Sequence, residues 1–129
     1  MKPATLPKPT IDNESEAFWH GTRDGRFLLK KCTDCGKLHW VPREICPHCM
    51  SDKTEWVPST GKGTIYSWSV VRRGGVEPYT LAYITLDEGI TLLSSVINCE
   101  IEDMAVGKDV QVTFLDNGDG QAIPYFELV

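Results

Sequence analysis

Cys32-Thr-Asp-Cys35 and Cys46-Pro-His-Cys49 are two Cys-x-x-Cys pairs separated by ten residues, and they decide the fold of the first half of this chain. Two short knuckles at this spacing can bring four thiolates around one metal ion in a tetrahedron. Four sulfur ligands close the coordination sphere and leave no position for a substrate or a reactive water. The pattern therefore predicts a structural zinc ribbon in which Cys32, Cys35, Cys46 and Cys49 are the metal ligands.

The choice of metal depends on the rest of the sequence. A four-thiolate site suits iron in a rubredoxin-type centre as well as zinc. Because nothing else in the chain suggests electron transfer, we expect one structural zinc ion, with iron as the competing metal. Gly36 follows the first knuckle, where a left-handed turn helps backbone amides to point at sulfur, and Met50 takes the equivalent place after the second. His39 and His48 are interpreted as surface or neighbouring residues, because the cysteines already complete the site.

The first nine residues are polar and rich in proline, without the apolar run of a secretory signal. We therefore expect a cytoplasmic protein, whose thiols stay reduced and favour metal binding over disulfides. No apolar stretch of the sequence approaches the length needed to span a bilayer, so no membrane association is expected.

Changes in composition and periodicity predict three segments, which are an N-terminal arm and helix (residues 1–27), the zinc ribbon (28–57) and a β-rich domain (58–129). The helix is expected to take Asn13 as its cap, with Glu16 completing a capping box. It is expected to end near Gly21 or Gly25.

From residue 63 onward the sequence alternates like β-strands and is punctuated by turn residues. We expect five strands, with a helical turn between the third and the fourth, which is the order of an OB-fold barrel. In the first of these strands one face should carry Tyr66, Trp68 and Val70. The other face should carry Ile65, Ser67, Ser69 and Val71. The predicted fold class is mainly β, with an N-terminal helix, a rubredoxin-like zinc ribbon and a five-stranded OB-fold barrel.

The sequence shows no self-sufficient active site. It contains no Gly-x-Ser-x-Gly, no phosphate-binding glycine loop with lysine and no dinucleotide fingerprint. Cys99 is the only candidate nucleophile, and it ends an apolar strand beside Glu100 and Glu102. A reactive thiolate needs a basic neighbourhood, so we expect Cys99 to pack in the core and the protein to be non-catalytic.

Zinc ribbons and OB folds also occur in proteins that bind single-stranded nucleic acid, which is the alternative function. Such proteins need a positive groove lined with stacking aromatic residues. Residues 54–129 carry four basic and eleven acidic side chains, and this surplus of negative charge would repel a polyanion. A local basic edge at Arg72 and Arg73 leaves the alternative open, but nucleic acid is the weaker hypothesis.

The order of these parts resembles a known family, the acyl-CoA-associated OB-fold proteins with an N-terminal rubredoxin-like zinc ribbon. The resemblance covers the chain from residue 14 onward. It is carried by Phe18-Trp19-x-Gly21, Asp24-Gly25-Arg26-Phe27-Leu28, Cys32-x-x-Cys35-Gly36, Cys46-Pro47-x-Cys49, Gly61-x-Gly63-Thr64-Ile65-Tyr66-Ser67, Leu86-Asp87-Glu88-Gly89 and Val106-Gly107.

Members of this family are usually accessory subunits of thiolase-like enzymes, namely thiolases, condensing enzymes, acyltransferases and side-chain aldolases. The resemblance implies that a partner supplies the nucleophile while this chain helps to bind or shield an acyl-CoA substrate. Lys62, Arg72 and Arg73 are then candidates for CoA phosphate binding, with solvated surface charge as the alternative. Phe18 and Trp19 are candidates for docking to the partner, with anchoring of the helix to its own domain as the alternative.

Overall fold

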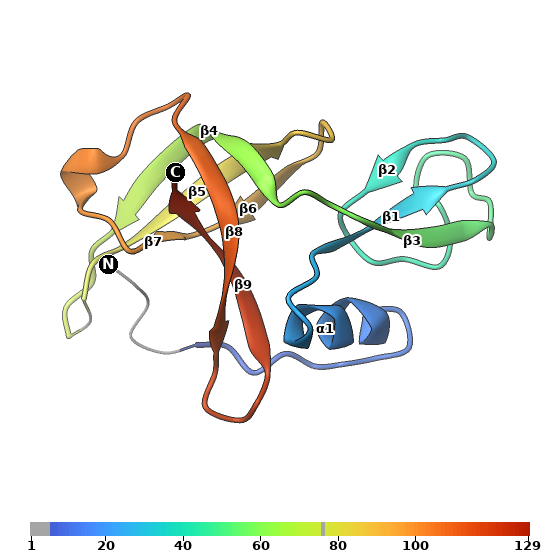
Figure 1. Ribbon diagram of the computed structural model, residues 1–129, viewed down its shortest axis with the longest axis horizontal. Coiled ribbons are helices and arrows are strands. Elements are labelled where there is room, and N and C mark those ends of the chain that lie inside the picture. Colours follow the sequence, from blue (N-terminus) through green and yellow to red (C-terminus); the bar gives the residue numbers. More distant parts are fainter. Residues whose placement is uncertain (1–5, 76) are drawn as a thin grey trace.

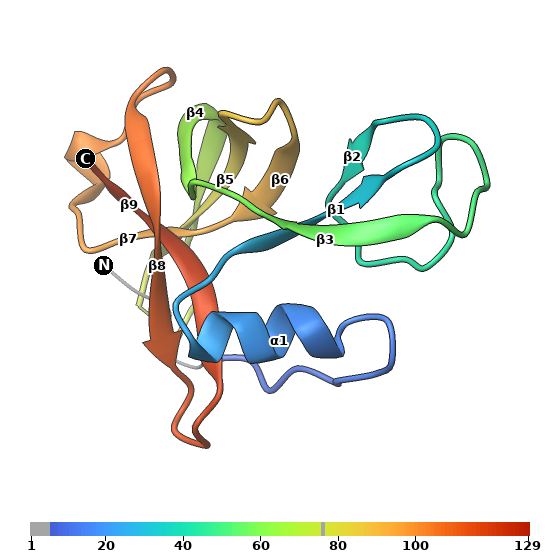
Figure 2. The same cartoon turned by 45° about the vertical axis from the view of Figure 1, so that its right-hand side comes forward.

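The computed structural model describes residues 6–75 and 77–129, and this part of the chain folds into one short α-helix and two β-sheets (Figure 1). A three-stranded sheet of order β2-β1-β3 forms the predicted ribbon, and a six-stranded sheet of order β6-β5-β4-β8-β9-β7 forms the β-rich domain. The helix α1 lies beside β9 and below the ribbon (Figure 2). The mainly β class and the N-terminal helix are confirmed.

The helix α1 (Glu16–Arg23) begins differently from the prediction. The Asp12 N–H donates to Ser15 Oγ at 3.1 Å, and the Ser15 N–H donates to Asp12 Oδ1 at 2.9 Å. Hydrogen bonds from the Ser15 side chain and from its backbone amide lower the pKa of Asp12. The N-cap of α1 is Ser15, which makes no side-chain cap hydrogen bond. The predicted cap at Asn13 was therefore wrong, because the carboxylate of Asp12 lies within reach of the backbone amide of Ser15.

The end of α1 is a Schellman motif. Gly25 has φ +74°, its N–H donates to Thr22 O, and the Arg26 N–H donates to Gly21 O at 2.8 Å. The predicted end near Gly25 is confirmed, and the motif turns the chain directly into the ribbon.

The ribbon sheet consists of β1 (Leu28–Cys32), β2 (Leu38–His39) and β3 (Thr54–Pro58), all antiparallel. Its central strand, β1, carries the first metal-ligand candidate at its end. On the same face Lys30 is buried, with its Nζ 4.6 Å from the centre of the Trp56 ring and 3.4 Å from Thr54 Oγ1. The aliphatic part of this lysine thus fills the small interior of the ribbon.

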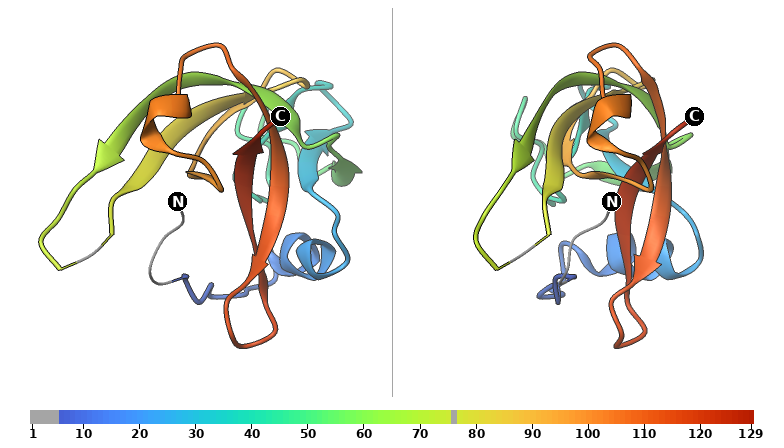
Figure 3. Two further views of the ribbon diagram at one scale, coloured as in Figure 1. Left: turned by 60° about the vertical axis from the view of Figure 1, so that its left-hand side comes forward. Right: turned by 90° about the vertical axis from the view of Figure 1, so that its left-hand side faces the viewer.

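The barrel contains β4 (Lys62–Val71), β5 (Tyr79–Leu86), β6 (Thr91–Ser94), β7 (Val96–Ile97), β8 (Asp109–Asp116) and β9 (Ala122–Leu128). The predicted third strand is broken at Ser95 into β6 and β7. Its first half pairs with β5 and its second half pairs in parallel with β9, so the sheet closes on itself (Figure 3). The 3-10 helix η1 (Ile101–Asp103) supplies the predicted helical turn before β8.

A buried threonine holds this break in place. Thr80 Oγ1 donates to Val96 O at 2.8 Å and accepts the Val96 N–H at 3.0 Å. Thr80 is 1% exposed, so its hydroxyl replaces the strand partner that Val96 lacks on this side.

The prediction placed Ile65 and Trp68 on opposite faces of the first barrel strand, and this was wrong. The pairing of β4 with β5 shifts by one residue between Ile65 and Ser67, which makes Tyr66 the extra residue of a β-bulge. A one-residue insertion exchanges the two faces of a strand. Ile65 and Trp68 therefore both pack against the core, while Tyr66 is 65% exposed.

Aromatic rings join the three parts of the fold. Phe27, just before β1, has ring-centroid distances of 6.0 Å to Phe18, 5.3 Å to Trp40 and 6.0 Å to Phe126. Helix, ribbon and barrel therefore share one hydrophobic core, and a change in the ribbon reaches the barrel through packed side chains.

Candidate metal centre

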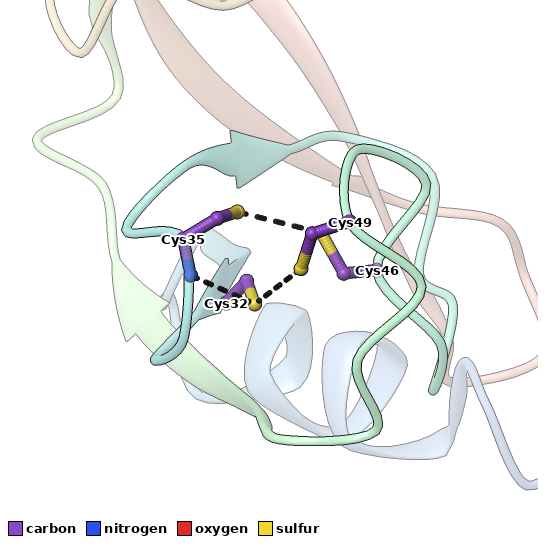
Figure 4. A group of neighbouring side chains, drawn as sticks. All are labelled: Cys32, Cys35, Cys46 and Cys49. Carbon is purple, nitrogen blue, oxygen red and sulfur yellow. Dashed lines mark hydrogen bonds between the residues drawn. The ribbon is translucent and has the colours of Figure 1, made fainter.

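The four cysteines predicted as ligands converge in space (Figure 4). Their Sγ atoms all lie within 4.8 Å of one another, with 3.5 Å between Cys32 and Cys49 and 3.7 Å between Cys35 and Cys46. Around a zinc ion with Zn–S bonds of about 2.3 Å, the edges of a sulfur tetrahedron are about 3.8 Å long. The donor set therefore fits a tetrahedral thiolate metal.

The two knuckles have the same backbone geometry. The Gly36 N–H donates to Cys32 O and the Met50 N–H donates to Cys46 O, both at 2.9 Å. Gly36 has φ +75° and Met50 has φ +67°. Met50 thus takes the place that glycine takes in the first knuckle, as predicted, and it does so with a backbone conformation that L-residues rarely adopt.

Backbone amides point at the sulfur atoms. The Cys35 N–H lies 3.5 Å from Cys32 Sγ, and the His48 N–H lies 3.4 Å from Cys46 Sγ. Hydrogen bonding by the Cys35 backbone lowers the pKa of Cys32 to about 7. The Ser51 amide acts in the same direction on Cys49, but the neighbouring thiols, Cys32 foremost, and burial outweigh it and raise the pKa of Cys49 to about 12.

The raised pKa of Cys49 has a simple electrostatic cause. Four negative sulfurs within van der Waals contact repel one another, so without a cation they cannot all ionise together. A divalent metal removes this repulsion and takes the place of the protons.

The histidines near the knuckles lie outside this cluster. Among the described residues, the four cysteines are the group of His, Cys, Asp and Glu side chains that could hold a metal. His39 is buried, which lowers its pKa, and its Nε2 lies 3.4 Å from Arg43 O while Nδ1 has no partner among the described atoms. His48 is exposed, with Nε2 3.3 Å from Leu38 O.

Cys99 lies in the core of the barrel. It is 9% exposed, its Sγ lies 3.9 Å from Met104 Sδ, and burial raises its pKa. A thiol in these surroundings is a poor nucleophile at neutral pH, which agrees with the packing role expected from the sequence.

The three basic residues considered for CoA are not brought together. Lys62 opens β4, whereas Arg72 and Arg73 directly follow its end, in the loop that leads to β5. At about 3.3 Å per residue, a strand of this length separates the two positions by about 30 Å. Lys62 instead borders a hollow that also contains Asp87 and Asp109.

The two aromatic residues considered for docking differ in exposure. Phe18 is 7% exposed, and its ring centre lies 5.0 Å from that of Trp19 and 5.4 Å from that of Trp40. Trp19 is half-buried and lines a hollow between the helix, the ribbon and the barrel. Of the pair, Trp19 alone presents appreciable surface.

Two family models match the sequence that builds these parts. The rubredoxin-like zinc ribbon domain of ChsH2 matches residues 19–55, and the C-terminal OB-fold domain of ChsH2 matches residues 56–115. A DUF35 domain-containing scaffold protein of Methanocaldococcus jannaschii is 34% identical over 118 residues, which cover 83% of each chain. The chain belongs to the ChsH2/DUF35 family.

Two further ChsH2/DUF35 relatives are known as parts of assemblies. The benzoylsuccinyl-CoA thiolase subunit BbsA of Thauera aromatica is 30% identical, over 93% of this chain and 90% of its own. A chain in the structure of the Ltp2-ChsH2(DUF35) aldolase superposes with a TM-score of 0.82 at 25% identity, over 94% of this chain and 98% of that one. The resemblance and the fold class predicted from the sequence are confirmed.

The helices of the structure also indicate whether the described residues could cross a membrane. In residues 6–75 and 77–129, no helix combines the length and the apolar character that crossing a membrane requires.

Proposed function

We propose that this ChsH2/DUF35 protein is a non-catalytic accessory subunit that binds a thiolase-superfamily enzyme and helps to bind or shield its acyl-CoA substrate. The observation that carries the proposal is the similarity along nearly the whole chain to a thiolase subunit and to the ChsH2(DUF35) chain of an aldolase. Both relatives belong to assemblies with such enzymes by name, and both match ribbon and barrel together.

The chemistry of the chain's own residues supports a non-catalytic role. Cys32, Cys35, Cys46 and Cys49 would hold one zinc ion, which supplies a structural cross-link and has no open coordination position. Cys99 is enclosed in the core with a raised pKa. The nucleophile for thioester chemistry would then come from the partner.

The zinc assignment has a direct test. Metal analysis of the purified protein should give one zinc per chain and a colourless solution. A red protein with one iron per chain would show that the four cysteines hold iron in a rubredoxin-type centre, and not zinc.

For the CoA phosphate we propose Arg72 and Arg73, because they are adjacent in the chain whereas Lys62 lies at the other end of β4. These neighbouring cations directly follow β4, in the loop that leads to β5, and this loop also contains Glu77. Two adjacent guanidinium groups can bind a phosphate together. In the complex, replacing both by alanine should raise the KM for acyl-CoA and leave kcat unchanged. Lys62→Ala, at the other end of β4, is the matched control and should leave both unchanged.

The accessory role is tested by isolating the tagged protein from the source organism and identifying what accompanies it. A thiolase-superfamily enzyme in a fixed ratio, whose activity depends on this chain, is the expected result. A solitary protein that changes the activity of no such enzyme would contradict the proposal.

A further inference from the structure

Beyond Lys62, which opens β4, the first three barrel strands contain no charged residue. The stretches 63–71, 79–86 and 90–98 lack Asp, Glu, Lys, Arg and His, although charged residues make up 24% of the chain. The outer side of an antiparallel sheet that faces water is normally polar. The absence of charged residues from these three neighbouring strands indicates that another molecule covers their outer side.

The register places large side chains on the outer side of these strands. Ala82 and Ile84 point into the core with 1% and 0% exposure, whereas Leu81 and Tyr83 alternate with them and are 36% and 49% exposed. On β6 the alternation continues, because Leu92 is buried and Leu93 is 52% exposed. Both apolar and aromatic surface therefore faces outward.

These outward residues are neighbours across the strands. Tyr83 lies opposite Ser67 of β4 and opposite Leu93 of β6, and Leu81 lies opposite Ser69. We name this surface the uncharged face and define it by its five members: Ser67, Ser69, Leu81, Tyr83 and Leu93. A hollow of about 320 Å³ lies over it and is also lined by Trp68.

The uncharged face continues toward the helix. Leu93 lines a second hollow, of about 160 Å³, whose other walls include Trp19 and Trp40. Pockets for small ligands usually measure about 300–1,000 Å³ and enclose most of the ligand. The second hollow is smaller than that, and its size suits a single side chain of a protein partner.

The composition of this surface matches the centre of a protein interface. Interface centres are depleted in charge and enriched in tyrosine and tryptophan, and contiguous exposed apolar surface marks interaction sites. Single-stranded nucleic acid fits poorly, because its binding grooves need cations along the backbone path, and the uncharged face has none.

We propose that the uncharged face is the docking surface for the thiolase-superfamily partner, and that the contact extends over Leu93 to Trp19. The inference rests on the proposed function for the nature of the partner. It assigns the contact to the barrel wall of β4, β5 and β6, whereas the exposed surface of α1 contributes through Trp19 at the margin. The partner must present an uncharged, largely apolar surface here, since a buried carboxylate or ammonium would find no counter-charge.

The test introduces one charge at a time into exposed positions. Leu93→Glu and Tyr83→Glu place a carboxylate on the uncharged face, while Val106→Glu and Val41→Glu place one on aliphatic side chains that are 66% and 52% exposed elsewhere. Zinc content and circular dichroism show that each variant is folded. The Kd for the thiolase-superfamily enzyme that co-purifies with the wild type is then measured by calorimetry.

We expect Leu93→Glu and Tyr83→Glu each to raise this Kd by at least about 30-fold, as for residues at the centre of an interface. Val106→Glu and Val41→Glu should change it less than about twofold. Hydroxyl-radical footprinting of the wild-type complex adds a readout without substitutions: the side chains of Tyr83 and Leu93 should become protected, while Met50 should stay reactive.

Equal Kd values for face and control variants, or unprotected Tyr83 and Leu93 in the complex, would overturn the surface assignment and leave the accessory role intact. A wild-type homodimer that Leu93→Glu converts to monomers would show that a second copy covers the face, which also overturns the assignment. If the wild type binds no thiolase-superfamily enzyme, the proposed function fails first and this inference falls with it.

Discussion

Replacing Met50 by glycine should stabilise the zinc-loaded protein, although the change removes a large side chain. Met50 has φ +67° and its side chain is 75% exposed, so truncation removes little packing. A left-handed backbone costs an L-residue about 1–2 kcal/mol relative to glycine. Glycine's greater freedom in the unfolded chain takes back about 0.5–1 kcal/mol. The net gain in the free energy of unfolding is therefore about 0.5–1 kcal/mol.

Gly36→Ala is the matched control in the other knuckle. Gly36 has φ +75°, and a Cβ at this position would meet nothing within 4 Å. The alanine therefore suffers the backbone cost without a steric clash, and we expect a loss of about 0.5–1 kcal/mol, opposite in sign to Met50→Gly.

Urea denaturation at a fixed, saturating zinc concentration measures both changes. With zinc held constant, metal binding contributes equally to each variant, and a shifted midpoint with an unchanged slope reports stability alone. A lower midpoint for Met50→Gly, or an unchanged one for Gly36→Ala, would refute the claim that the two knuckles share a left-handed position with this energetic cost.

Four other results are expected. The affinity for zinc should rise with pH, because binding must displace the proton of Cys49, whose pKa without metal is about 12. Competition with a chromogenic chelator across pH 6 to 8.5 would detect this rise. An affinity that does not change with pH would contradict it. Removing zinc with EDTA should unfold the ribbon and also lower the melting temperature of the barrel, because Phe27 packs against both. If calorimetry shows the barrel melting separately, at an unchanged temperature, the two parts do not share a core. Thr80→Val should cost about 1–3 kcal/mol by leaving the Val96 N–H and C=O without a partner, whereas Thr80→Ser, which keeps the hydroxyl, should cost clearly less in urea titrations. Cys99→Ser should leave the activity of the complex unchanged, and loss of kcat would assign the thiol a catalytic part.

The parts of the fold that could be predicted from the sequence are those set by local chemistry. The spacing of the cysteines alone brings their thiols together, because each knuckle is a short turn with fixed reach. Gly25 ends α1 where a residue with positive φ is needed. The turn residues between apolar runs give the order of the barrel strands.

Other features depend on tertiary pairing and left no local signal. The bulge at Tyr66 arises from the register between β4 and β5, and the break at Ser95 arises because one segment pairs with two different strands. The separation of Lys62 from Arg72 follows from the length of β4. The uncharged face did have a sequence signal, the missing charges of three strands, but only the register shows which side chains point outward.

The central claim is that this chain has no reactive centre of its own and acts through an enzyme partner. The most direct measurement compares hydrolysis or cleavage of an acyl-CoA thioester by the purified zinc protein, by the co-purifying thiolase-superfamily enzyme, and by the two together. The account predicts no turnover by the zinc protein alone and higher kcat/KM for the enzyme when the zinc protein is added. Thioester turnover by the zinc protein alone, at a rate that survives removal of every trace of the enzyme, would contradict it.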